Sequence, residues 1–572
     1  MRRLTICRRV TAFLFMALLS ACSGGNGGNQ ASTSVSTNSI TFSVASPDAT
    51  TPSSQSFSAT VSAGTIFVVV QHNGAAIANA SYTLSGTTVQ VVVDPPSPAS
   101  LGAGDFTGTV TVTGFSCGDP TCSRPVTGNM QIVNVTYQIA PIVRFVAPYV
   151  APANTPGTVV IRGQGFQRFS VTGVTFGTTA ATTFTVISDT QIEASYPALS
   201  AGATGTTYPV QIQAPSSPGT ITSQANLVAV NAPGYTTMTI SYPSGTPQVN
   251  ELIFDAERQA LLVADAASGE VLRYAFNGGT WSTSQAIAGL SDIALATDGQ
   301  HLLALSQANM YQLIADSTLA SDLTTPAPTF GIAGTVLKNL AVGNDGNAVV
   351  TTGNPPSTST GLFVYSACNA ININTTCTPA FSQPASAPTL DNSTAVGSSD
   401  GSLIAIMHGD STLTSPPSVF QYVAASDTFY ATSVTLNQYS TNPVAPAVSV
   451  FTPANSTTST TRLVLSGTDA NNAAVINVYD GNYNLLGTLP NTTRAVVLYQ
   501  DATPHVFAYT YDSASSQVLR YDLTASQSGG AYSSIASAPA ANPGANVRMA
   551  ISPDGGTLFI AGSSQIVVQP AP

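Results

Sequence analysis

Charged side chains are scarce in this chain of 572 residues, because Asp, Glu, Lys and Arg together make up only 7% of it. Lys338 is the only lysine, and 15 basic residues stand against 26 acidic ones, which gives a formal net charge of −11. Recognition of nucleic acid depends on clustered basic groups that neutralise phosphates. The composition therefore excludes a basic nucleic-acid-binding surface, and no nucleic acid is expected among the partners.

Long hydrophobic runs are missing too. The apolar stretch 10–19 is far shorter than the roughly 20 residues of a transmembrane helix, and it fits the central region of a secretory signal. A basic head precedes it, and Leu19, Ser20, Ala21 and Cys22 follow it. These four residues resemble a bacterial lipobox, which implies that residues 1–22 are a lipoprotein signal peptide and that Cys22 is acylated. The alternative is an ordinary signal peptide with an incidental cysteine.

Ser23 follows the cysteine at the position where an inner-membrane retention signal has Asp. By resemblance to enteric lipoproteins, this favours lipid anchoring in the outer membrane, on its periplasmic or its cell-surface face. Residues 23–39 are rich in Gly, Ser and Asn and lack apolar periodicity, so they are predicted to be a flexible tether.

Cysteine is also rare, with six residues in all. Besides Cys7 and Cys22, four remain in two local pairs, Cys117 with Cys122 and Cys368 with Cys377. In an oxidising compartment such pairs are expected to be disulfides. The rival hypothesis, a four-thiolate zinc site, is disfavoured by both spacings and by the lack of a nearby histidine. No metal site or cofactor is predicted.

The rest of the chain alternates short apolar strands with turns, which indicates an all-β protein. In residues 40–140, six or seven strands with period-two patterning predict an immunoglobulin-like β-sandwich. Residues 141–232 resemble an IPT/TIG domain, another immunoglobulin-like sandwich, through the segments 157–166, 174–177 and 189–194. The resemblance implies a spacer or an interaction module in an extracellular chain.

Residues 233–572 carry an irregular repeat in which two strands flank a turn ending in Asp-Gly, at Gly299, Gly346, Gly401 and Gly555. Units of this length and pattern are typical of β-propeller blades, and seven are expected. The layout resembles the YncE-like and lactonase-like propellers. Only three strands follow residue 546, so the spare strand 235–242 is predicted to complete the final blade and close the ring.

Catalytic groups are few. The four histidines lie in or beside different predicted strands and form no metal-binding pair; they are His72, His301, His408 and His505. Ser399 lies in a Gly-Ser-Ser-Asp-Gly stretch that matches a nucleophile elbow, but a strand follows it where the elbow needs a helix. A blade turn is the better interpretation, and no catalytic residue is predicted.

The aromatic residues Tyr274, Trp281, Tyr311, Tyr365, Tyr422, Tyr479 and Tyr521 recur about once per blade and are interpreted as blade-packing residues. The predicted function is a membrane-anchored binding or scaffolding module for a protein or polysaccharide at the cell envelope. The alternative is a propeller enzyme, such as a lactonase or glycan lyase. Convergence of an arginine, a histidine and two carboxylates on the channel would favour the enzyme.

Overall fold

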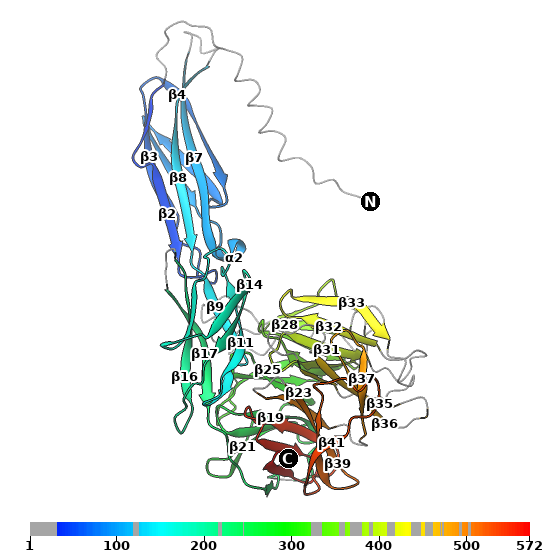
Figure 1. Ribbon diagram of the computed structural model, residues 1–572. Helices are drawn as coiled ribbons and strands as arrows, with labels where there is room; N and C mark the ends of the chain where they lie inside the picture. The colour runs from blue at the N-terminus through cyan, green and yellow to red at the C-terminus, as the bar shows by residue number, and fades with distance from the viewer. Residues whose placement is uncertain are drawn as a thin grey trace. The chain divides into compact units, whose positions relative to one another are not determined.

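The computed structural model describes the residues 31–117, 125–215, 220–243, 245–321, 335–353, 361–366, 380–387, 390, 393–408, 418–435, 448–451, 461–468, 471, 474–490, 495–501 and 505–572 (Figure 1). The chain divides into two compact units, residues 1–139 and residues 140–572. Nearly all regular structure is β-strand, as the sequence predicts. Within the described residues, no helix has the length and apolarity needed to cross a membrane.

The first unit is a sandwich of two four-stranded sheets. One sheet has the order β1-β3-β6-β5 and the other β2-β8-β7-β4. The strands are β1 (Thr33–Val35), β2 (Ser39–Val44), β3 (Gln55–Val61), β4 (Thr65–Gly74), β5 (Asn79–Ser85), β6 (Thr88–Asp94), β7 (Gly104–Cys117) and β8 (Pro125–Ile139), with the short helix α2 (Pro98–Leu101) between β6 and β7. Alternate residues such as Val89, Val91 and Val93 point into the core between the sheets.

This sandwich begins earlier than the sequence predicts. Thr33 pairs with Val61 across β1 and β3, inside the stretch 23–39 that was expected to be a tether. Two hydrogen bonds join Thr33 and Asn129: the Thr33 amide donates to the side-chain oxygen, and the Asn129 amide group donates to the Thr33 carbonyl. The apolar pattern of residues 31–35 is too weak to predict a strand, and pairing with β3 stabilises the strand that forms there.

The second unit starts with the sandwich that the IPT/TIG resemblance predicts. Its sheets have the orders β10-β17-β16-β12-β13 and β14-β15-β11-β9. The strands are β9 (Ile142–Ala147), β10 (Val150–Pro152), β11 (Gly157–Gln164), β12 (Gly173–Phe176), β13 (Thr179–Ala180), β14 (Thr183–Ser188), β15 (Gln191–Tyr196), β16 (Thr206–Gln213) and β17 (Thr220–Val230). Phe166 and Phe176 are fully buried in its core.

The described parts of residues 238–570 form seven further sheets of antiparallel strands, as expected for propeller blades. In chain order, the first six consist of β19 (Val249–Asp255), β20 (Ala260–Asp265), β21 (Glu270–Ala275) and β22 (Thr280–Thr283); β23 (Leu290–Leu295), β24 (His301–Ser306) and β25 (Met310–Ile314); β26 (Leu337–Val342), β27 (Asn347–Thr352), β28 (Leu362–Ser366) and β29 (Ala380–Ser382); β30 (Ser393–Gly397), β31 (Leu403–His408), β32 (Ser418–Val423) and β33 (Thr428–Thr435); β34 (Val448–Phe451), β35 (Arg462–Thr468), β36 (Ala474–Tyr479) and β37 (Leu485–Leu489); and β38 (Val496–Gln500), β39 (Val506–Asp512), β40 (Gln517–Asp522) and β41 (Ser534–Pro539).

The seventh sheet closes the ring. It contains β42 (Arg548–Ile551), β43 (Thr557–Ala561), β44 (Ile566–Pro570) and, as its outermost strand, β18 (Met238–Ile240). Met238 pairs with Val568 and Ile240 with Ile566. The prediction that segment 235–242 completes the final blade is therefore confirmed. The first strands of successive sheets, β19, β23, β26, β30, β34, β38 and β42, are neighbours around the ring, and β42 lies beside β19.

Candidate functional site

The first strand of each sheet has two ends that differ in their surroundings. At one end the chain turns into the second strand, and at the other it enters from the preceding sheet. We call these the turn end and the entry end of the ring. Glu251 of β19, for example, lies near the entry end, and Asp255 lies at the turn end about 13 Å further along the strand.

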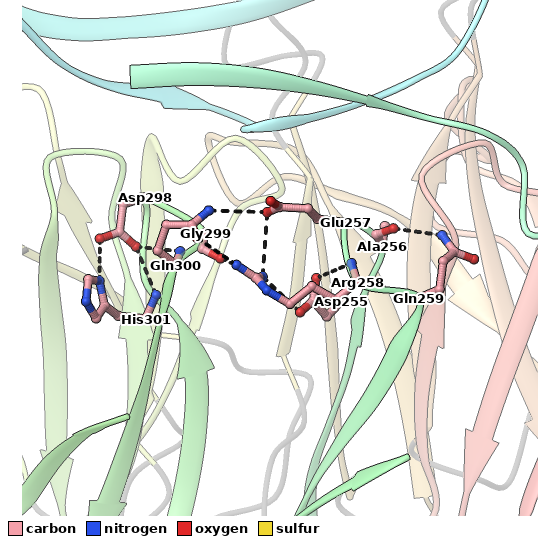
Figure 2. Close-up of polar contacts among 9 residues, drawn as sticks. All are labelled: Asp255, Ala256, Glu257, Arg258, Gln259, Asp298, Gly299, Gln300 and His301. Carbon is pink, nitrogen blue, oxygen red and sulfur yellow. Dashed lines mark hydrogen bonds and ion pairs between the residues drawn. The ribbon is translucent and has the colours of Figure 1, made fainter. Parts of the chain in front are cut away.

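A polar network joins the first two turns at the turn end (Figure 2). Arg258 donates from Nη1 to Asp255 Oδ2 at 3.0 Å and to the Gly299 carbonyl at 2.9 Å. Its Nη2 donates to Gln300 Oε1 at 2.9 Å, and Glu257 Oε2 lies 3.5 Å from Nη1. Burial lowers the pKa of Arg258, but Asp255 and Glu257 outweigh burial, so the net pKa is raised. Arg258 thus remains charged and links two blades.

His301 belongs to the same network. Its Nδ1 lies 2.6 Å from Asp298 Oδ2, and Asp298 Oδ1 accepts the backbone N–H groups of His301 and Gln300 (Figure 2). The His301 side chain is almost completely buried. Asp298 is the acid of the predicted Thr-Asp-Gly turn, so this pair stabilises the turn of a blade.

The IPT/TIG-like sandwich packs on this turn end. The ring of Tyr149 lies so close to Gly299 that a Cβ atom there would meet its Cε2 at 2.2 Å. Burial raises the pKa of Tyr149 well above its ordinary value, and the nearby Asp255 and Glu257 act in the same direction. Val228 and Val230 of β17 pack with Ala256 and Phe254 in a small core of their own. The turn end is therefore covered at the first two blades.

A second contact reaches the next two blades. Arg162 of β11 donates from Nε to Asn344 Oδ1 at 2.8 Å, and Asn344 donates from Nδ2 to the Asp400 carbonyl at 3.0 Å. Both Arg162 and Asn344 are buried, and burial lowers the pKa of Arg162. The sandwich and the propeller are thus joined through a buried arginine.

Tyr422 lies close to this contact, and its hydroxyl group is between two carboxylates. Its hydroxyl oxygen is 2.6 Å from Asp345 Oδ2 and 2.7 Å from Asp427 Oδ1. Burial raises the pKa of Asp345, and the hydrogen bond from Tyr422 opposes this rise.

At the entry end, side chains of the first strands bond from blade to blade. Arg548 donates from Nε to the Asn250 carbonyl at 2.8 Å, and Asn250 donates from Nδ2 to the Ser291 carbonyl at 2.9 Å. Asp292 Oδ2 accepts from the Leu340 amide at 2.8 Å and from Asn339 Nδ2 at 2.5 Å. The Ala395 amide donates to Asn339 Oδ1 at 2.6 Å. We call these four side chains, Asn250, Asp292, Asn339 and Arg548, together with the neighbouring Glu251, the entry belt.

The entry belt brings charges of both signs together. Asp292 is 3% exposed, and burial together with the neighbouring Glu251 raises its pKa well above its usual range. Burial also raises the pKa of Glu251, which Arg548 opposes. Lys338 lies next to Asn339 on β26, and burial lowers the pKa of its amine. Arg548 and Glu251 retain contact with solvent. These groups can donate and accept hydrogen bonds toward a polar ligand.

The convergence expected for an enzyme is met only in part. The charges of Glu251, Asp292 and Arg548 influence one another, whereas His301 lies at the turn end. His72 is in β4, His301 and His408 are in β24 and β31, and His505 precedes β39 near Asp501. In the part of the chain that the structure describes, no three His, Cys, Asp or Glu side chains are grouped to hold a metal ion.

Ser399 occupies a turn, as predicted. The neighbouring Ser398 donates from Oγ to Asp400 Oδ1 at 2.6 Å and accepts the Leu403 amide at 3.1 Å. Gly401 has φ +65°, and β31 follows directly. Ser399 itself is exposed, so the stretch is a blade turn whose second serine points to solvent.

The recurrent aromatic residues pack within the blades. Tyr365, Tyr422, Tyr479 and Tyr521 are fully buried, and Tyr274 packs against Trp281 with ring centroids 5.1 Å apart. The blade-packing interpretation is therefore confirmed for these residues.

The entry belt was not predicted from the sequence. Glu251, Asp292 and Arg548 lie in three separate sheets, and no local motif joins them. The signal that was available is positional: Asp292 and Asn339 occupy the third residue of β23 and of β26. Glu251 is the third residue of β19 as well, so an alignment of the first three blade starts would have shown polar residues there.

The cysteine predictions fall largely outside the described residues. Cys117 ends β7, whereas Cys22, Cys122, Cys368 and Cys377 lie outside them. Lipidation and both disulfide pairings stay predictions.

Comparison with known proteins finds no curated protein that matches this chain. Solved structures with a similar overall course include an auxiliary nutrient binding protein from Bacteroides ovatus, at 10% identity with a TM-score of 0.35, covering 76% of this chain and 98% of that one. A gluconolactonase from Xanthomonas campestris shares 12% identity with a TM-score of 0.33, over 59% of this chain and 90% of its own. A protein of unknown function from Desulfotomaculum acetoxidans shares 16% identity with a TM-score of 0.34, over 54% and 93%. Residues 141–230 match the IPT/TIG domain family, which agrees with the resemblance seen in the sequence.

Proposed function

We propose that this chain is an outer-membrane lipoprotein, anchored through an acylated Cys22, that binds a protein or polysaccharide partner at the cell envelope. In this proposal the entry end of the propeller receives the ligand. The observation that supports this proposal is that the two ends of the propeller differ in their surroundings. The IPT/TIG-like sandwich contacts the turn end at the first three blades, whereas the entry belt gathers acidic, basic and amide groups.

The entry belt suits a ligand rich in hydroxyl or amide groups. Glu251 and Arg548 offer an acceptor and a donor that reach solvent, and Asn339 and Asp292 hold the strands behind them in place. Because hydrogen bonds to charged groups are stronger than neutral ones, a few such contacts can select a polar ligand.

Binding can be tested on the unlipidated mature chain with an array of envelope polysaccharides and peptides. Glu251→Gln should weaken capture of any ligand that the wild type retains, whereas Arg168→Gln, on the exposed surface of the IPT/TIG-like sandwich, should leave it unchanged. Equal capture by all three proteins would contradict a site at the entry belt.

The anchor is tested separately by fractionating cells that carry Cys22→Ala. The variant should leave the membrane fraction or stall in processing, because multiple acylation of Cys22 is the proposed source of stable attachment. Wild-type amounts of correctly processed variant in the membrane would contradict the anchor. Protease treatment of whole cells, probed for the propeller, distinguishes the periplasmic from the cell-surface face.

The second candidate function is hydrolysis of a lactone or cleavage of a glycan at the same belt. The observation that favours it is the Glu251 and Asp292 pair, in which burial raises both pKa values beside Arg548. A carboxyl group with a raised pKa can serve as a general acid near neutral pH. Turnover of a lactone panel that Asp292→Asn abolishes would favour this enzyme over the binding module.

A further inference from the structure

An apolar face without charged side chains lies on the outer side of the sheet β2-β8-β7-β4 in the first sandwich. The exposed fractions are 40% for Phe67, 56% for Met130 and 45% for Ile132. Half-buried Phe115 and Val69 complete the set, which we call the outer apolar face.

Strand register places these residues on one side of the sheet. Phe67 is opposite Phe115, with stacked rings 4.5 Å apart, and Val69 is opposite Thr113, which is opposite Met130. The core of the sandwich takes the alternate residues, such as Val68 and Val112. The outer apolar face is therefore a second hydrophobic surface and not an opening of the core.

The described strands that carry this face are almost without charge. Neither β4 nor β8 contains Asp, Glu, Lys or Arg, and Asp105, near the start of β7, is the only such residue in that strand. A surface without acidic groups meets no repulsion from anionic headgroups. Aromatic and aliphatic side chains together are typical of surfaces that settle at a bilayer interface.

The route of the chain brings this face close to the predicted anchor. The Asn129 amide donates to the Ala31 carbonyl at 3.2 Å, and Met130 is the next residue along β8. Only eight residues lie between Cys22 and Ala31, and the nine Cα-to-Cα steps that join the two span at most about 32 Å. An acylated Cys22 must therefore lie within that distance of Ala31, which is beside Met130. The lipid headgroups around the acylated cysteine lie within the same distance.

We propose that the outer apolar face rests on the lipid surface, so that the first sandwich is a membrane-contacting platform and not a free stalk. This inference rests on the proposed lipid anchor. The lipid acyl region receives Phe67, Met130 and Ile132, and the tether limits how far the sandwich can leave the bilayer.

The test uses the mature chain from residue 23, held by an N-terminal hexahistidine tag on vesicles of phosphatidylethanolamine and phosphatidylglycerol with nickel-chelating and brominated lipids. Trp281 is the only natural tryptophan, and it lies in the propeller. The Phe67→Trp variant should gain fluorescence that brominated lipids quench. Ile535→Trp, at a propeller position that is 56% exposed, is the matched control and should show no added quenching. Equal quenching of both variants, or of neither, would overturn the inference.

A second measurement needs no tag. In vesicle sedimentation, Met130→Asp combined with Ile132→Asp should weaken partition of the unlipidated chain about tenfold or more, and Ile535→Asp should not change it. If sedimentation without lipid instead shows a dimer that the double variant dissociates, the face is an interface between two copies and the inference is wrong. Because neither measurement uses the acyl groups, these results are independent of whether Cys22 is acylated in cells, which palmitate labelling decides.

Discussion

Removal of one side chain from the closing strand tests what holds the propeller together. Ile240 of β18 is 5% exposed and packs in one core cluster with Phe559 of β43 and Leu261 of β20. Truncation of a buried isoleucine to alanine typically costs about 2–5 kcal/mol, through lost burial and the cavity that remains. We expect Ile240→Ala to lower the free energy of unfolding of the head by that amount. Met238→Ala in the same strand, where the side chain is 38% exposed, should change it by less than about 0.5 kcal/mol.

The contacts of segment 235–242 explain why the effect should spread beyond one sheet. Tyr242 donates to the Gly562 carbonyl at 2.8 Å in the last sheet, and Tyr235 donates to Gln259 Oε1 at 2.7 Å in the first. Trp281 donates from Nε1 to the Ser241 carbonyl at 3.0 Å. The segment therefore bonds to both sheets that meet at the closure.

Two probes separate a local effect from a global one. Fluorescence of Trp281 in urea reports on the closure, and hydrogen exchange of β31 reports on a sheet that does not touch it. If β18 stabilises the whole ring, Ile240→Ala should move both transitions to lower urea together. A shift in the Trp281 signal without faster exchange in β31, or equal shifts for Ile240→Ala and Met238→Ala, would refute this reasoning.

The remaining predictions concern acidity, a turn and the cysteines. Burial raises the pKa of Asp292 in the folded protein above its unfolded pKa of about 4. The stability that Asp292 contributes is therefore full below about pH 4 and is lost as the pH rises through the folded pKa. Asp292→Asn should flatten this fall in the free energy of unfolding, as measured by urea titrations at increasing pH. Ser398→Ala should cost about 1–3 kcal/mol by leaving the Leu403 amide without its acceptor, whereas Ser399→Ala should cost less than about 0.5 kcal/mol; loss of a hydrolase activity in a folded Ser399→Ala variant would contradict the turn interpretation. Peptide mass mapping without reduction should join Cys117 to Cys122 and Cys368 to Cys377, and a bond between the two pairs would contradict the domain division.

Local chemistry explains which parts of the fold the sequence predicts. The Asp-Gly turns are visible because Gly299, Gly346, Gly401 and Gly555 all adopt positive φ, where glycine is strongly favoured. The IPT/TIG-like strands are visible for a similar reason, since turn glycines and apolar alternation agree in order. Ring closure followed from the need to cover an open strand edge.

The interfaces were not predictable in this way. The contact of Arg162 with Asn344 joins residues 182 positions apart, and Arg548 reaches Asn250 across 298 positions. Such pairs depend on how the sheets are arranged around the ring, which no local pattern records. The early start of the first sandwich was missed because Thr33 and Val35 form too short a stretch to show periodicity.

The pairing of β18 with β44 also constrains when the head can reach its final structure as the chain is made. Ile240 is synthesised early, but its partner Ile566 lies beyond almost all of the propeller. Until that partner is available, β18 has an unsatisfied strand edge, which is a site for pairing with a wrong strand. The ring can therefore close only after synthesis of the last sheet, so the first and last parts of the head complete their folding together.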